Sequence, residues 1–282
     1  ARLFYLQVLD TSSQISSQNN AVKKVFDYPQ RGFIFDRNGE LLVSNQPSYD
    51  VMVIPKNIDS FSSELKKEFC ELLKITEEKY DNILKRAKIY SPRLPSVVVS
   101  QFTKDEYAYL SEKMWKYKGF YIQKRSLREY QVSNSANVFG YIAEVNKTII
   151  DKNSYYQMGD LIGKAGVEME YENILRGKKG VKHLQMDRFN REIGSYQEGV
   201  FDTIPINGKD ITLTIDSRLQ EYGEKLLTNK RGGIVALEPS TGEILALISA
   251  PNYDPKLLVG RERSKNFTKL WYDTISRPLF DR

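Results

Sequence analysis

Two short patterns in this chain combine the residue types of a serine nucleophile site. Ser63 and Lys66 have the spacing Ser-x-x-Lys, which would place the lysine amine one helical turn from a hydroxyl that it could activate. Ser135 and Asn137 have the spacing Ser-x-Asn, but no Lys-Thr-Gly follows them. Because each pattern fixes only two positions, it recurs by chance in a chain of 282 residues. We therefore expect Ser63 to cap a helix and Lys66 to belong to a solvated charged run.

Paired carboxylates occur in a stretch that we expect to form one helix, from Asp160 to Gly177. Glu168 and Glu172 stand four residues apart and would share one face of that helix. A glycosidase needs two carboxylates that face each other across a substrate, which neighbours on one exposed helix do not do. We expect an exposed charged or salt-bridged face instead. The opposite, apolar face would consist of Val167, Tyr171, Ile174 and Leu175.

Composition limits the remaining kinds of site. One cysteine, Cys70, allows no internal disulfide or cysteine metal cluster, and one histidine, His183, argues against a Ser-His-Asp triad and histidine metal sites. We expect no cofactor. The net charge of +6 fits a basic surface or contact with an anionic membrane or cell wall. No compact Lys/Arg run with interleaved aromatic residues indicates nucleic-acid binding, and no run of about 18 apolar residues predicts a membrane span.

Two stretches predict hairpins. Asn38-Gly39 lies between strands expected at Phe33–Asp36 and Glu40–Ser44, with Asp36 and Arg37 as a structural ion pair beside the turn. Turn residues that include Pro239 and Gly242 separate Ile234–Leu237 from Ile244–Ile248. Because these two runs are almost continuously apolar, we expect strands buried on both faces at the centre of a sheet.

The other elements follow from caps and periodicity. Helices are expected after Ser62 or Ser63, after Thr76, after a capping box at Thr103–Glu106, and from a capping box at Ser217–Gln220 to about Thr228. Strands are expected at Ser48–Pro55, Val97–Val99, from Gly119, at 181–187, at Glu192–Tyr196 and at Ile211–Asp216. This mixture of elements predicts an α+β fold.

Several of these strings resemble class B penicillin-binding proteins. Residues 31–45 match R-G-x-I-x-D-R-N-G-x-x-L-A-x-N except at Val43, where that family has Ala, and residues 163–177 match G-x-x-G-x-E-x-x-Y-E-x-x-L-x-G. Residues 208–220 and the hairpin at 233–255 resemble the opening of the family's transpeptidase domain. The positions that form this structural signature are Arg31, Gly32, Asp36, Arg37, Asn38, Gly39, Gly166, Glu168, Tyr171, Gly177, Asp216 and Gly242.

The resemblance implies an elongated, dimerisation-type pedestal domain followed by the start of a β-lactamase-like transpeptidase domain. We expect a juxtamembrane stalk at 1–30, a pedestal at 31–206 with a head insertion at about 57–137, and the first transpeptidase elements at 207–282. The segment Ala1–Asp10 is similar to the helix end that follows the family's membrane anchor. Residues 268–282 resemble the segment before the family's active-site serine, so we expect the catalytic Ser-x-x-Lys beyond Arg282 and no catalysis by this chain.

What the longer protein does also follows from the resemblance alone. It would be an elongation-type D,D-transpeptidase at the periplasmic face of the bacterial inner membrane, acting on peptidoglycan stem peptides and acylated by β-lactams. Its pedestal would bind a SEDS-family glycosyltransferase and an MreC-type scaffold. Three alternatives stay open: a division-type relative, a non-catalytic β-lactam sensor or scaffold, and a complete penicillin-recognising enzyme that uses Ser63 and Lys66.

Overall fold

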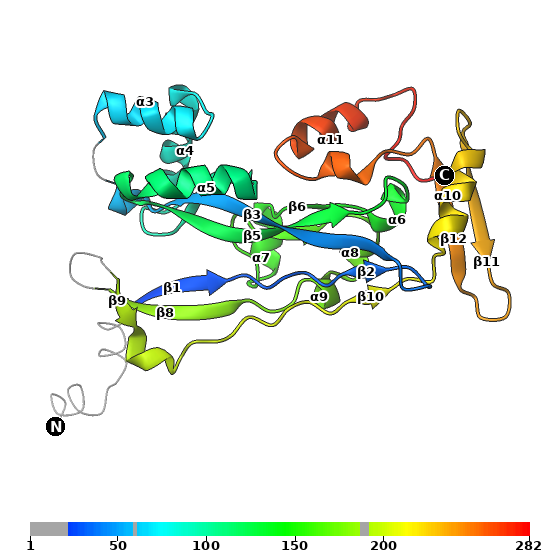
Figure 1. Ribbon diagram of the computed structural model, residues 1–282, viewed down its shortest axis with the longest axis horizontal. Helices are drawn as coiled ribbons and strands as arrows, with labels where there is room; N and C mark the ends of the chain where they lie inside the picture. Colours follow the sequence, from blue (N-terminus) through cyan, green and yellow to red (C-terminus); the bar gives the residue numbers. More distant parts are fainter. Residues whose placement is uncertain (1–21, 59–60, 187–191) are drawn as a thin grey trace. The chain divides into compact units, whose positions relative to one another are not determined.

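The computed structural model describes residues 22–58, 61–186 and 192–282 (Figure 1). These residues form two compact units. The first comprises the described residues up to Pro29 together with Gly177–Asn207, and the second comprises Gln30–Arg176 and Gly208–Arg282. The helix end predicted at Ala1–Asp10 lies outside the described residues.

The first unit contains a three-stranded antiparallel sheet. Its strand order is β1 (Val22–Asp27), β8 (Gly180–Met186) and β9 (Glu192–Ser195), and a 3-10 turn, η4 (Tyr196–Gly199), follows β9. The end of the predicted stalk is therefore part of a sheet, because Val22–Asp27 pairs along β8.

The central sheet of the second unit has the order β10-β2-β3-β4, and β5 also pairs with β3. Its strands are β2 (Ile34–Phe35), β3 (Leu41–Val53), β4 (Ser96–Phe102), β5 (Phe120–Tyr130) and β10 (Ile211–Thr212). β2 and β3 form the hairpin predicted at Asn38-Gly39, where Gly39 has a φ of +82°. A side chain with a Cβ would be strained at that φ, so glycine suits this turn.

β3 is one strand of 13 residues, whereas the sequence predicts two strands on either side of Pro47. Proline cannot donate a ladder hydrogen bond and is usually confined to strand edges. β2 pairs with β3 before Pro47, β4 pairs with it after Pro47, and only β5 pairs with it at Pro47. One side of β3 is thus unpaired at this residue within the described sheet, which tolerates the missing N–H.

Three helices cover one end of this sheet (Figure 1), and we call them, together with the turns and strands that they pack on, the head. They are α3 (Ser63–Leu72), α4 (Glu77–Tyr90) and α5 (Lys104–Lys113), with 3-10 turns η2 (Pro55–Asn57) and η3 (Met114–Lys116). The Ser62 and Thr76 side chains cap α3 and α4, each accepting a backbone N–H bond of 3.2 Å. The capping box predicted at Thr103 and Glu106 is confirmed, with bonds of 3.3 and 3.1 Å.

Aromatic side chains form the centre of the head. The Phe69 ring is fully buried, and its centroid lies 4.2 Å from that of Tyr117 and 4.6 Å from that of Phe120. Tyr80 and Phe61 each place a ring centroid 6.1 Å from Phe69, in edge-to-face geometry. Because aromatic residues bury large areas and prefer such offset contacts, this cluster supplies much of the head's packing energy.

The single helix predicted from Asp160 to Gly177 is wrong. This stretch contains β7 (Leu161–Gly163) and two short helices, α8 (Gly166–Glu170) and α9 (Glu172–Leu175), which are separated at Tyr171. The segment before it contains α6 (Ala136–Phe139), β6 (Ile142–Glu144), which pairs with β7, and α7 (Lys147–Lys152). A helix through Gly166 is excluded because its φ is +55°.

The apolar face predicted for that helix is wrong in part. Leu175 is buried and Val167 packs against the same core, but Tyr171 and Ile174 are exposed. The interruption at Tyr171, which has a φ of −98° and a ψ of 19°, rotates the second short helix relative to the pattern of a continuous one.

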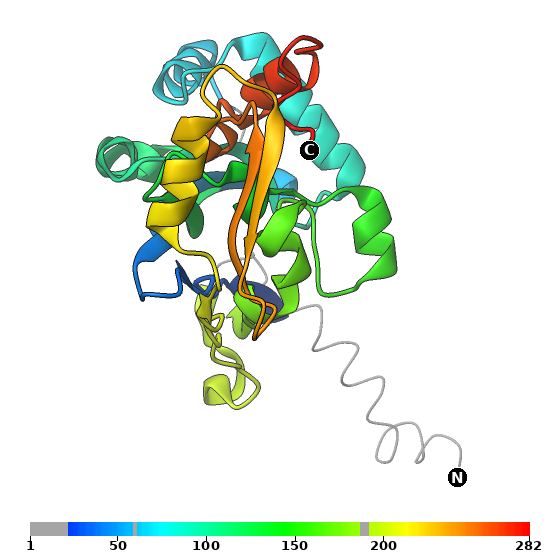
Figure 2. The ribbon, with the colours of Figure 1, turned by 90° about the vertical axis from the view of Figure 1, so that its right-hand side faces the viewer.

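The predicted hairpin near residue 240 is confirmed, but its predicted burial is wrong. β11 (Gly232–Leu237) pairs with β12 (Ile244–Ala250), and α10 (Ser217–Leu226) lies beside them (Figure 2). The Gln220 side chain donates to the carbonyl of Leu247 and accepts from its N–H, both at 2.8 Å. The other face of this two-stranded sheet leaves Val235 and Leu237 exposed within the described structure.

The chain ends with η5 (Pro255–Leu258) and α11 (Arg263–Trp271). Within the described ranges, no helix combines the length and the hydropathy that crossing a bilayer requires.

Candidate functional site

Ser63 and Lys66 do not form a nucleophile and its base. Ser63 is the first residue of α3, after the true cap Ser62, so the expectation that Ser63 itself caps the helix is wrong. The Lys66 amine points to α4, where it lies 2.9 Å from Asp81 and 3.7 Å from Glu77. The hydrogen bond to Asp81 raises the pKa of Lys66. A general base needs a lowered lysine pKa, so this environment opposes the chemistry.

We therefore expect that a fluorescent penicillin leaves Ser63 unmodified. Intact-mass measurement after incubation should give the same mass for the chain and for its Ser63→Ala variant. A one-to-one adduct that maps to Ser63 and disappears in the variant would overturn this interpretation.

Ser135, the serine of the second pattern, also forms local structural contacts. Ser135 has a left-handed φ of 63°, its N–H donates to Glu224 at 2.7 Å, and its hydroxyl donates to Asn134 at 3.1 Å. The side-chain nitrogen of Asn137 is buried without a hydrogen-bond partner. Among the described hydrogen bonds of Ser135, none is to a lysine amine.

The ion pair predicted between Asp36 and Arg37 is wrong. Asp36 is fully buried, and its carboxylate accepts from the N–H groups of Asn38 and Glu40, both at 2.8 Å, which closes the hairpin turn. Arg37 instead lies 3.5 Å from Glu243 at the β11–β12 turn.

The N-terminus of α10 is capped by Asp216, whose carboxylate accepts from the backbone N–H groups of Arg218 and Leu219 at 3.0 and 3.1 Å. The predicted capping box at Ser217 is therefore wrong.

The glycines of the predicted signature lie at turns and close approaches. A Cβ on Gly32 would lie 1.9 Å from the carbonyl oxygen of Lys209, which would force the backbone apart. Four others have positive φ angles: Gly39, Gly166, Gly177 and Gly242.

Glu168 and Glu172 are buried in a charge cluster, so the exposed face predicted for them is wrong, although salt bridges are present. Arg31 donates to Glu168 at 2.7 Å and to Glu172 at 2.6 Å. The Nε of Arg128 donates to the other oxygen of Glu168 at 2.6 Å. These two cations and two anions balance each other's charge, and we call them the buried charge cluster.

Neighbouring groups satisfy most of the remaining donors and acceptors of this cluster. The Tyr156 hydroxyl donates to Glu172 at 2.9 Å, and the N–H of Gly163 donates to the other oxygen at 3.0 Å. Arg128 also donates to the carbonyl of Gly32 at 2.7 Å and to Asn45 at 2.9 Å. The cluster thus joins the segment before β2 to β3, β5, β7, α8 and α9 of the second unit.

Burial and charge act in opposite directions on Glu168. Burial alone would raise its pKa, but the charges of Arg128 and Arg31 and their hydrogen bonds hold the pKa below its ordinary value. A carboxylate with a lowered folded-state pKa stabilises the fold above its unfolded-state pKa, about 4.3, and this contribution is lost as the pH falls through the folded value.

We therefore expect the free energy of unfolding to fall as the pH is lowered below about 4.3. Urea denaturation between pH 3 and pH 7 would measure it, and the Glu168→Gln variant should show a shallower dependence on pH. Equal slopes for the two proteins would contradict the assignment to Glu168.

The buried charge cluster is suited to holding segments together, not to reacting. Glu168 and Arg128 are fully buried, so a substrate has no access to them. The sequence placed Arg31 and Glu168 in a structural signature, but it did not predict that they pair or that Arg128, Glu172 and Tyr156 join them. No local signal identifies Arg128, because its pattern in β5 is that of an ordinary solvated arginine in a strand.

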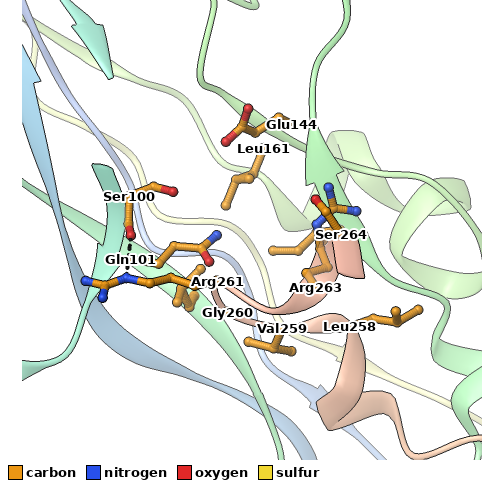
Figure 3. Close-up of a pocket in the computed structure, with 12 residues that line it drawn as sticks. Ser100, Gln101, Glu144, Leu161, Leu258, Val259, Gly260, Arg261, Arg263 and Ser264 are labelled. Carbon is orange, nitrogen blue, oxygen red and sulfur yellow. Dashed lines mark hydrogen bonds between the residues drawn. The ribbon is translucent and has the colours of Figure 1, made fainter. Parts of the chain in front are cut away.

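A small cavity of about 120 Å³ lies where the head meets the η5–α11 segment (Figure 3). Arg261 closes one side of it, donating from Nε to the carbonyl of Ser100 at 3.1 Å and from a terminal nitrogen to Glu106 at 3.3 Å. Its guanidinium also lies 3.9 Å from the centroid of the Phe102 ring. These contacts connect Arg261 to β4 and α5, a role that the sequence did not indicate.

The cavity lining has no obvious catalytic pair. It contains Ser100 and Ser264 as hydroxyls and Glu144 as its carboxylate, but no cysteine, histidine or lysine. Among the described residues, no group of three His, Cys, Asp or Glu side chains could hold a metal ion. Neither His183, on β8 near Asp202, nor Cys70, buried on α3, is among the residues that line the cavity.

The sequence relatives agree with this architecture. The model of the penicillin-binding protein dimerisation domain matches residues 26–213. The chain is 31% identical to peptidoglycan D,D-transpeptidase MrdA of Acinetobacter baumannii and to MrdA of Escherichia coli K12, over its whole length in both cases. It spans 42% and 45% of those two relatives, so it corresponds to less than half of each.

Solved structures of a penicillin-binding protein also resemble this chain. The chain matches penicillin-binding protein PBP2 in its complex with MreC from Helicobacter pylori with a TM-score of 0.75 and 26% identity, over 93% of this chain and 49% of that one. The match to H. pylori PBP2 by itself has a TM-score of 0.65 and 25% identity, over 92% of this chain. The chain is homologous to the N-terminal part of these transpeptidases, and it belongs to the penicillin-binding protein dimerisation-domain family.

Proposed function

We propose that this chain is the pedestal of a peptidoglycan D,D-transpeptidase of the PBP2 type, and that it serves as a docking module for an MreC-type scaffold. The observation that carries the proposal is the likeness to PBP2 in complex with MreC, which extends over 93% of this chain. The buried charge cluster is consistent with a docking role, because a charge-balanced, hydrogen-bonded network makes the second unit rigid.

The longer protein would cross-link stem peptides during cell elongation and would be acylated by β-lactams. It would be held at the periplasmic face of the inner membrane and would also bind a SEDS-family glycosyltransferase. In this proposal the present chain supplies position and partner contacts, and the nucleophile comes from residues outside it. The names of the relatives as D,D-transpeptidases support this assignment.

The first unit offers an apolar surface suited to a protein partner. Residues 203–206 are extended beside the start of β8, with bridges from Thr203 to Val181 and from Ile206 to Lys178, so alternate side chains share one face. Ile204 and Ile206 lie on that exposed face, and Ile204 is 86% exposed. Val200 and Phe201 just before them are also exposed. Exposed apolar groups concentrated in one short segment are typical of a protein interface.

The test is the affinity of this chain for the periplasmic part of the MreC homologue from the same organism, measured by surface plasmon resonance. We expect saturable binding, and we expect Ile204→Lys to weaken it by roughly tenfold or more, because a buried isoleucine contributes about 1.5–3 kcal/mol.

The matched control is Ile275→Lys, which changes an isoleucine that is 75% exposed in the second unit. It should bind within about twofold of the unchanged chain, since surface substitutions away from an interface have small effects. Absence of saturable binding would refute MreC docking. Equal weakening by both variants would refute the assignment to the segment around Ile204.

A further inference from the structure

The C-terminal half of α4, which Figure 1 labels, and the turn after it are rich in lysine and arginine. Lys85, Arg86, Lys88 and Arg93 lie within nine residues, and residues 82–104 contain no Asp or Glu. All four of these side chains belong to exposed residues. This part of the head is therefore strongly basic even though the chain as a whole is only moderately so.

These four cations have no ion-pair partner among the described residues, unlike three of the other lysines of the head. Lys66, Lys74 and Lys116 each form a salt bridge, to Asp81, Glu106 and Glu68 respectively. None of the four cations on α4 and its turn forms a salt bridge with a described residue. Their charge is thus available to an external anionic surface.

Large apolar side chains stand among these cations. Ile89 is 76% exposed, and Tyr90 and Leu94 are also exposed. In α4 the buried residues include Tyr80 and Ala87, and Ile89 lies on the opposite side of the helix from them. Lys85 and Arg86 stand four and three residues before Ile89, so they flank it on that outer face.

We propose that this basic and apolar patch, Lys85–Leu94, docks the head on the surface of a bilayer that contains anionic lipids. Helix surfaces that combine Lys and Arg with protruding apolar and aromatic side chains bind such interfaces: the cations contact lipid phosphates and the apolar groups enter the headgroup region. Three separate exposed apolar side chains, at the end of α4 and in the turn after it, suit a fluid surface. A protein partner needs a complementary patch of about 800 Å² per side.

The experiment is co-sedimentation of the chain with vesicles, either phosphatidylglycerol with phosphatidylethanolamine or phosphatidylcholine alone. We expect binding to the anionic vesicles only, weakened by added salt because exposed charges are screened. The Lys85→Glu/Arg86→Glu variant should lose more than about 20-fold in partitioning, since each cation near such a surface contributes about fivefold. Ile89→Ser should also bind less.

Matched controls distinguish the effect of this patch on vesicle binding from the effect of the chain's net charge. Lys147→Glu/Lys152→Glu makes the same change in net charge on exposed residues of α7, and Ile275→Ser removes an equally exposed isoleucine elsewhere. Both should partition like the unchanged chain. The proposal is overturned by equal losses in the control pair, by equal binding to phosphatidylcholine, or by no vesicle binding. Binding to polyglutamate without vesicle binding would identify a protein-docking surface instead.

Discussion

Replacing Glu168 by glutamine is expected to lower the free energy of unfolding by about 3–5 kcal/mol, the range seen when one partner of a buried ion pair is removed. Glu168 is fully buried and accepts from both Arg31 and Arg128. Glutamine has a similar shape but no charge, so it would leave one buried guanidinium without a balancing anion. Urea denaturation at pH 7 measures the change.

Glu170→Gln is the control, because Glu170 is exposed on the same short helix. It should change the free energy of unfolding by no more than about 0.5 kcal/mol. A second variant tests the coupling: Glu168→Gln combined with Arg128→Met leaves Arg31 balanced by Glu172. The double variant should be more stable than the sum of the single effects predicts, by about 0.5–3 kcal/mol. Strict additivity would show that the charges are not coupled.

The second large effect is expected in the head, where Phe69→Ala should lower the free energy of unfolding by about 3–5 kcal/mol. Phe69 is fully buried and contacts the rings of Tyr117 and Phe120. Alanine would leave a cavity that these rings cannot fill by small movements, because protein interiors are close-packed. Hydrogen exchange should show the loss of protection concentrated in α3, α4 and β4.

Trp115→Ala provides the matched control for Phe69→Ala. The Trp115 side chain is 78% exposed although it belongs to the same head. Its removal should change the free energy of unfolding by no more than about 0.5 kcal/mol. If both aromatic substitutions destabilise the chain equally, the central role of the buried cluster is wrong.

Local elements were predictable where the deciding interactions lie within a few residues. The Thr103–Glu106 capping box, the cap at Thr76, and the turns at Gly39 and Gly242 are of this kind. A cap needs only a side-chain oxygen two or three residues from a free N–H, and a tight turn needs only a residue that tolerates positive φ. The resemblance of whole strings then identified the family.

Predictions failed where the deciding partner is distant in sequence. Asp216 and Ser217 are both good caps on local grounds, and the structure uses Asp216 while the Ser217 hydroxyl bonds to Asp36, 181 residues away. Gln220, expected to complete a capping box, bonds instead to the backbone of Leu247. Local residue preferences distinguish only weakly between two such caps, and contacts with distant segments determine which one is used.

Sequence alone was enough to predict the hairpin turns at Gly39 and Gly242, most of the head's helices and the family, because caps, turn residues and hydrophobic periodicity act over short distances. The burial of Glu168 and Glu172 with Arg31, the addition of Arg128 to them and the contact of Arg261 with the head depend on long-range packing. Glu168 and Arg31 are 137 residues apart. A charged residue is stable inside a protein only beside its counter-charge, and no local pattern specifies which distant segment supplies it.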